Sequence, residues 1–101
     1  MLDADPVSVW LERGAEPALI RPHARAAERS RVEYRVTVRR EGVAGRSSVA
    51  QGGRQVLEPG AATSLGVIRV NRSPQDACTV EVVIASDGGK RARWRFDCPP
   101  P

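Results

Sequence analysis

The stretch ACTVEVVIASDGGKRARWRFDCP, residues 77–99, decides how the fold is interpreted. On both sides of its glycines, apolar and polar side chains alternate, and this is the period of a half-buried β-strand. The glycines allow the positive φ that tight hairpin loops require. We therefore predict an antiparallel hairpin whose loop is formed by residues 87–89.

One register of this hairpin places all of its apolar residues on the same face. In that register the facing pairs are Ile84 and Ala92, Val82 and Trp94, Val80 and Phe96, and Cys78 and Cys98. A shift by one residue would set apolar against charged side chains throughout, so the pattern fixes the pairing. The two cysteines then lie close enough to bridge, and we predict a disulfide, with two buried free thiols as the alternative. A disulfide favours an oxidising compartment such as the periplasm.

The rest of the chain also shows strand-like patterns, separated by turns rich in Gly and Pro. Residues 31–40 give the clearest one, and Pro22 indicates an edge or bend in another. Residues 24–30 are interpreted as a connection. The other expected strands are 7–11, 18–24, 46–51, 54–58 and 63–70.

This spacing of short strands predicts an all-β fold. We expect one antiparallel β-sandwich domain over residues 1–101, of about seven to eight strands and arranged like an immunoglobulin or fibronectin-III domain. Residues 98–101 should form an extended proline tail. The large side chains of the core should be Tyr34, Trp94 and Phe96.

The same alternation sends charged side chains to the outer face of one predicted sheet. This sheet should contain residues 31–40 and both strands of the last hairpin, with 78–86 in the middle. Glu81 and Val83 should then lie between two arginine flanks. The candidate binding residues on these flanks are Arg35, Arg39, Arg91, Arg93 and Arg95.

The cationic composition has two explanations, a solvated basic face without a partner, which is the commoner one, or a surface for an acidic partner. The net charge is +4, and all but one of the 16 cationic residues are arginine. Such a surface attracts polyanions or acidic proteins. Single-strand nucleic-acid binders need exposed aromatic rings among their cations, whereas here only Trp10 lies off the apolar face of its strand. We therefore expect no nucleic-acid partner.

Other classes lack their sequence signals. No apolar run approaches the roughly 18 residues that a membrane span needs, and we expect no membrane insertion. The first residues, MLDADP, are acidic and do not resemble a signal peptide. The single histidine, His23, is expected on the surface, and no hydrolase, metalloprotease or nucleotide-binding motif occurs. We expect no enzymatic activity, no metal site and no cofactor.

A family resemblance extends this interpretation. The stretch YRVTVRREGVAGRSSVAQGGRQVLEPGAATSLGVIRVN, residues 34–71, is followed by a strand, a DGG turn and a strand ending in CP. This pattern resembles the CsgH family, small periplasmic curli assembly proteins of alphaproteobacteria that are functionally related to the CsgC amyloid inhibitors. The resemblance covers roughly residues 31–99.

The resemblance implies an immunoglobulin-like sandwich that keeps the major curli subunit from forming amyloid in the periplasm. It implies no catalysis. We expect a monomer that binds early aggregates of this client through the basic sheet face or a strand edge. The alternative is a structural or interaction module, immunoglobulin-like in fold, of a larger surface assembly.

Overall fold

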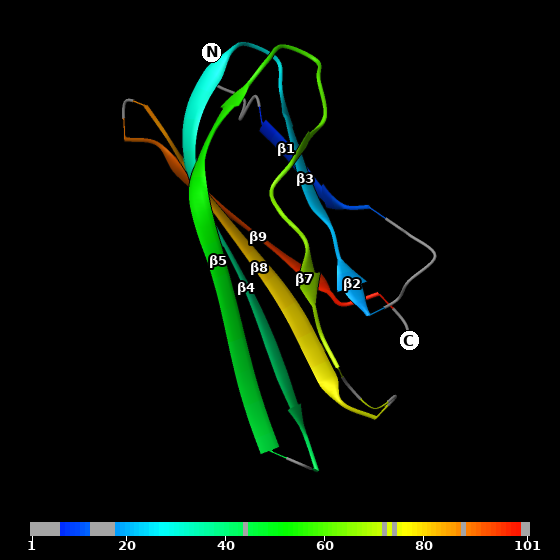
Figure 1. Ribbon diagram of the computed structural model, residues 1–101. Coiled ribbons are helices and arrows are strands. Elements are labelled where there is room, and N and C mark those ends of the chain that lie inside the picture. The colour runs from blue at the N-terminus through cyan, green and yellow to red at the C-terminus, as the bar shows by residue number, and fades with distance from the viewer. Residues whose placement is uncertain are drawn as a thin grey trace.

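The structure is a computed structural model that describes residues 7–12, 18–43, 45–71, 73, 75–87 and 89–99. Within these ranges all regular secondary structure is β-strand, which confirms the expected all-β fold (Figure 1). No helix of the described part is long and apolar enough to cross a membrane. The strands are β1 Val7–Leu11, β2 Leu19–Ile20, β3 Pro22–Ala26, β4 Ser30–Gly42, β5 Gly45–Leu57, β6 Thr63–Ser64, β7 Ile68–Arg69, β8 Ala77–Ser86 and β9 Arg91–Asp97.

The main sheet has four antiparallel strands in the order β5-β4-β8-β9. The predicted hairpin register is confirmed, with Val82 facing Trp94 and Val80 facing Phe96. The predicted disulfide is also confirmed, since Cys78 and Cys98 are bridged with their Cα atoms 5.4 Å apart. As expected, β8 lies in the middle of this sheet, between β4 and β9.

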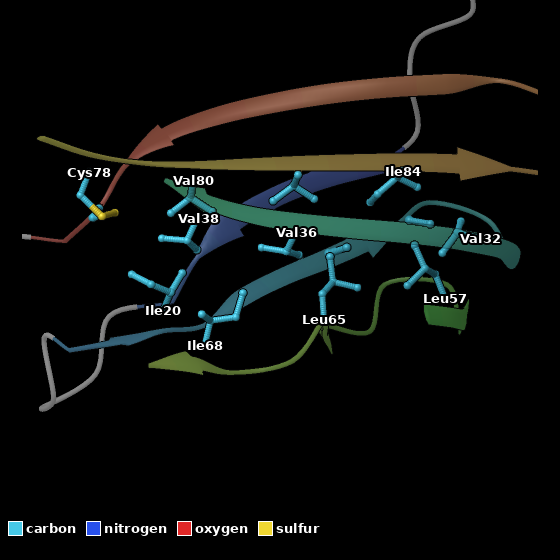
Figure 2. Packing of buried hydrophobic residues seen from close by; sticks show 14 residues of the cluster. Ile20, Val32, Val36, Val38, Leu57, Leu65, Ile68, Cys78, Val80 and Ile84 are labelled. Atoms are coloured by element: carbon cyan, nitrogen blue, oxygen red, sulfur yellow. A yellow bond between two sulfur atoms is a disulfide. The ribbon is translucent and has the colours of Figure 1, made fainter. Parts of the chain in front are cut away.

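A second layer of shorter strands covers one face of the main sheet. It contains the antiparallel groups β1-β3-β6 and β2-β7, which lie together on one side of the molecule (Figure 1). Ile20, Leu65 and Ile68 from this side point toward the valines of β4 and β8 (Figure 2). The molecule is thus a two-layer antiparallel β-sandwich, as the sequence predicted, whereas the finer comparison with immunoglobulin domains stays a prediction.

The core is aliphatic, and this corrects the expectation that Tyr34, Trp94 and Phe96 would form its centre. These three aromatic side chains are half-buried and pack against the core from its periphery. Trp94 and Phe96 lie on β9, which is an edge strand, so the short second layer covers them incompletely. The largest fully buried side chains are instead Ile20, Leu57, Leu65, Val36, Val80, Val82 and Pro22.

The strand that follows β4 is longer than the sequence suggested. Residues 46–51 and 54–58 were expected as two short strands separated by glycines, but β5 is one strand of 13 residues paired with β4 along its full length. A Cβ atom on Gly52 would lie 2.9 Å from the backbone oxygen of Tyr34. Gly52 therefore permits close pairing of β5 with β4 and does not mark a turn.

Two other expected strands are divided. Residues 63–70 form β6 and β7, separated by Gly66, whose φ of 112° only glycine adopts readily. Residues 18–24 divide at Arg21 into β2, which pairs with β7, and β3, which begins at Pro22 and pairs with β1 and β6. Residues 24–26 belong to β3, so only residues 27–29 of the expected connection lie outside strands. Half of the predicted proline tail, residues 100 and 101, lies outside the described residues.

Candidate functional site

The five candidate arginines all lie on the outer face of the main sheet. Each is exposed to solvent, because the second layer covers only the opposite face. Arg35 and Arg39 project from β4, while the other three project from β9. We call Arg35, Arg39, Arg91, Arg93 and Arg95 the basic face.

The registers place these arginines in rows across the sheet. Arg35 and Arg93 both face Val83 of β8, so they flank one apolar residue. The next row contains Thr37, Glu81 and Arg95. Neighbouring strands are about 4.8 Å apart, so the two flanks are separated by about 10 Å. An extended acidic segment can contact both flanks at once.

One carboxylate neutralises part of the basic face. Glu81 lies between the flanks, and its side chain is only 16% exposed. Its Oε2 atom is 3.5 Å from Nε of Arg93 and 3.5 Å from Nε of Arg95. This carboxylate orients the two guanidinium groups and lowers the net charge of the β9 flank.

The uncompensated charge therefore lies elsewhere on the face. Within the described residues, Arg35, Arg39 and Arg91 have no carboxylate within ion-pair distance. Arg35 and Arg39 both lie on β4. Because they are four positions apart, their side chains point to the same face of the strand. Arg35 and Arg39 are the pair most available to an acidic partner.

β5 completes this face in a way that sequence reasoning missed. Its pairing with β4 places Gly52 beside Arg35 and Ser48 beside Arg39. Two further arginines, Arg46 and Arg54, also lie on β5, but each forms an exposed ion pair with a glutamate of β4, at 2.7 and 3.4 Å. Exposed pairs of this kind contribute little to stability. In the sequence, only the alternation within residues 46–51 indicated a strand here. That alternation does not show that β4 is the neighbouring strand.

At the end of the sheet near the β8–β9 turn, the same face is hollowed. The hollow is lined by Arg31, Glu33, Arg54, Val56, Ala85 and Asp87, among others. Cations and carboxylates alternate around it, so it does not favour one sign of charge. We assign no ligand to this hollow.

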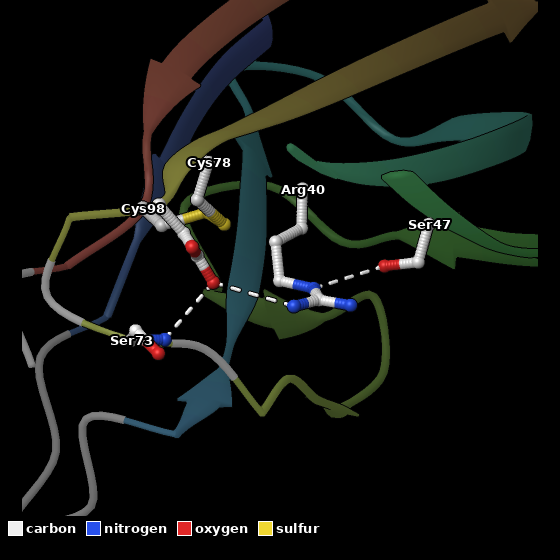
Figure 3. The surroundings of a disulfide bond; sticks show 6 residues. Arg40, Ser47, Ser73, Cys78 and Cys98 are labelled. Carbon is white, nitrogen blue, oxygen red and sulfur yellow. Dashed lines mark hydrogen bonds and ion pairs between the residues drawn. A yellow bond between two sulfur atoms is a disulfide. The ribbon is translucent and has the colours of Figure 1, made fainter. Parts of the chain in front are cut away.

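Near the disulfide, a polar cluster fixes the chain that leads into β8 (Figure 3). Arg40 donates from Nη1 to Asp76 Oδ2 at 3.3 Å and from Nε to Ser47 Oγ at 3.1 Å. The backbone N–H of Ser73 donates to the same Asp76 oxygen at 2.9 Å. The Asp76 side chain is only 8% exposed, and the cluster connects β4, β5 and the segment before β8. These contacts are structural.

The sequence prediction for His23 was wrong. Its side chain is 14% exposed and its ring stacks on Trp10 with centroids 5.9 Å apart. Its Nε2 atom lies 3.6 Å from Glu12 Oε2, and Arg25 lies 5.6 Å from the Trp10 ring. The ring is covered because β1 pairs with β3, which sets Trp10 directly opposite His23. Among the described residues, no group of three potential ligands is arranged to hold a metal ion.

Comparison with known proteins identifies the fold. No protein-family model and no curated protein sequence matches the chain. Among solved structures, the solution structure of CsgH from R. palustris aligns with a TM-score of 0.72 and 15% identity, covering 90% of this chain and 91% of that one. The E. coli curli protein CsgC aligns with a TM-score of 0.70 and 16% identity, covering 92% and 98%. The chain therefore has a fold like that of CsgH and CsgC.

Proposed function

We propose that the protein is a chaperone-like inhibitor of amyloid formation by the major curli subunit, and that it acts in the periplasm. The observation that carries this proposal is the exposed basic face on a sandwich whose fold is like that of a curli protein. The disulfide between Cys78 and Cys98 supports an oxidising compartment.

The chemistry of the face suits an acidic client. Guanidinium groups stay charged at any physiological pH and bind carboxylates through paired hydrogen bonds. Arg35 and Arg39 present this group without an internal carboxylate among the described residues. The face attracts early aggregates that display many acidic side chains, because each additional contact adds to the same electrostatic attraction.

The proposal predicts a salt-dependent effect on fibrillation of the curli subunit. Fibrillation is followed by dye fluorescence with the protein present, at about 0.1 M and about 1 M salt, where the Debye length falls from about 10 Å to about 3 Å. The lag before fibril growth should lengthen at low salt and shorten toward that of the client alone at high salt. Equal inhibition at both salt concentrations would contradict a role for the basic face.

A pair of matched variants tests the face itself. In the test variant Arg35 and Arg39 are replaced by Ser, and in the control Arg25 and Arg29 are replaced by Ser. Both variants lose the same charge, but Arg25 and Arg29 lie outside the main sheet. We expect the first variant to inhibit weakly and the second to inhibit like the wild type. Equal loss in both variants would assign the effect to net charge alone.

A further inference from the structure

β5 presents a free strand edge. It is hydrogen-bonded to β4 on one side, and no other strand of the described chain pairs with it. No backbone hydrogen bond from its other side occurs in the described part of the chain. Residues 45–54 are all exposed. An unpaired edge of this length offers a row of N–H and C=O groups to an added strand.

The opposite edge of the sheet, formed by β9, does not favour an added strand. β9 sends Arg91, Arg93 and Arg95 outward at alternate positions. Such a row of like charges discourages an added strand. In β5, by contrast, residues 47–53 carry no charge. The two edges of one sheet thus differ, and only the β5 edge is open to strand addition.

The outward side chains next to this edge favour an acidic occupant. A strand added to β5 would lie two strand spacings, about 10 Å, from β4. Gly52 lies between such a strand and Arg35, and Ser48 lies between it and Arg39. Gly52 has no side chain and Ser48 a short one, so a carboxylate on the added strand can meet each guanidinium group above β5.

The inward side of the edge favours uncharged side chains. Val49 of β5 is 44% exposed, and Val67, whose backbone oxygen accepts a hydrogen bond from Nε2 of Gln51 on β5, is 47% exposed. A hollow of about 190 Å³ lies next to Val49 and is lined by Val38 and Val70, with the polar residues Arg40, Ser47, Arg69 and Asn71 around it. Apolar or amide side chains on the inner face of an added strand would cover these valines.

We infer that the β5 edge docks an extended segment of a partner protein in which two acidic residues, four positions apart, face Arg35 and Arg39 and the residues between them are uncharged. The spacing follows from the period of a strand, because only residues an even number of positions apart share a face. This docking rests on the proposed function for its choice of partner, the curli subunit, and adds to it the strand and the side-chain pattern that are recognised.

A second copy of this chain fits the edge less well. β5 contains no acidic residue, so pairing of two β5 strands would leave Arg35 and Arg39 facing neutral or cationic side chains. Self-association through this edge therefore lacks the charge complementarity that an acidic segment provides.

The pattern is tested with two capped peptides of about ten residues, the length that spans the exposed part of β5 when extended. Both contain Val, Gln and Ser with two Glu residues, placed four positions apart in one peptide and three apart in the other. Each exposed charge pair is worth a factor of roughly two to five in affinity, so the first peptide should bind about two- to fivefold more tightly. Equal affinities would overturn the inference.

The location of peptide binding is tested by NMR of the backbone amides and by one substitution with its control. Binding should shift the NMR signals of the β5 amides. It should also slow the hydrogen exchange of those β5 N–H groups that point away from β4. Ser48→Glu places a carboxylate next to Arg39 and should weaken binding more than Ser48→Gln, which lengthens the side chain by a similar amount without adding charge. Ser48 is exposed, so neither change should disturb folding. Shifts confined to β9, or a dimer that forms through β5, would overturn the inference.

Fibrillation of the curli subunit separates this inference from the proposed function. If the wild type delays fibrillation but binds both peptides equally, the docking is wrong and the function stands. If the first peptide docks on β5 as described but fibrillation is not delayed, the proposed function is wrong and β5 remains a peptide-binding edge.

Discussion

At the scale of single residues, the adjacent glycines Gly52 and Gly53 of β5 meet different parts of Tyr34. A Cβ atom on Gly52 would lie 2.9 Å from the Tyr34 backbone oxygen, which cannot move without disturbing β4. A Cβ atom on Gly53 would lie 3.1 Å from the Tyr34 hydroxyl, which is the end of a half-buried side chain and can shift. The neighbouring glycines therefore have unequal tolerance for a side chain.

This difference predicts unequal costs for the two alanine substitutions. Gly52→Ala should destabilise the protein by about 1–3 kcal/mol, the usual cost of forcing atoms into a packed position. Gly53→Ala should be nearly neutral, because the smaller clash is offset by the lower chain entropy of the unfolded state. Urea denaturation of the two variants measures both values. A larger loss for Gly53→Ala than for Gly52→Ala would contradict the contacts described.

Trp94 provides a second test at this scale. Its ring is half-buried beside the aliphatic core, so Trp94→Ala should reduce the free energy of unfolding by about 2 kcal/mol. A fully buried Trp would cost roughly 3–5 kcal/mol. Chemical denaturation measures the difference, and a loss above about 4 kcal/mol would show that the ring belongs to the core centre after all.

At the scale of elements, the sequence predicted the last hairpin well because its register is encoded locally. Apolar residues fill one face of both strands, and in β9 they alternate with charged residues throughout, so only one pairing keeps the apolar residues of both strands on one face. β5 was not predictable in the same way. Gly52 and Gly53 resemble a turn in the sequence, and only the approach of Tyr34 shows that they continue a strand.

The disulfide closes this hairpin and gives a prediction for the element. Cys78 and Cys98 are 20 positions apart, a separation for which loop entropy alone corresponds to roughly 3 kcal/mol. The paired strands already hold the ends together, with the Cys98 N–H donating to the Cys78 oxygen at 3.1 Å. Replacing both cysteines by Ser should therefore lower stability by about 3 kcal/mol or less without changing the fold. An unchanged denaturation midpoint would show that the bridge adds no stability.

At the scale of the whole molecule, the outward direction of the basic face followed from strand alternation alone. The charge balance on that face did not, because it depends on which strands are neighbours. Glu81 neutralises part of the β9 flank, while β5 leaves Arg35 and Arg39 beside Gly52 and Ser48. The outward position of the five arginines was therefore predictable from the sequence, whereas the two that lie on β4 without a carboxylate partner among the described residues were not.

The most direct measurement of the central claim is the lag before fibril growth of the curli subunit, with the protein present well below the client concentration. We compare the wild type with a variant in which Arg35, Arg39, Arg91, Arg93 and Arg95 are all replaced by Ser. The account predicts a clear delay with the wild type and little or none with the variant, although both are folded. An equal delay with the two proteins, or no delay with the wild type, would contradict it.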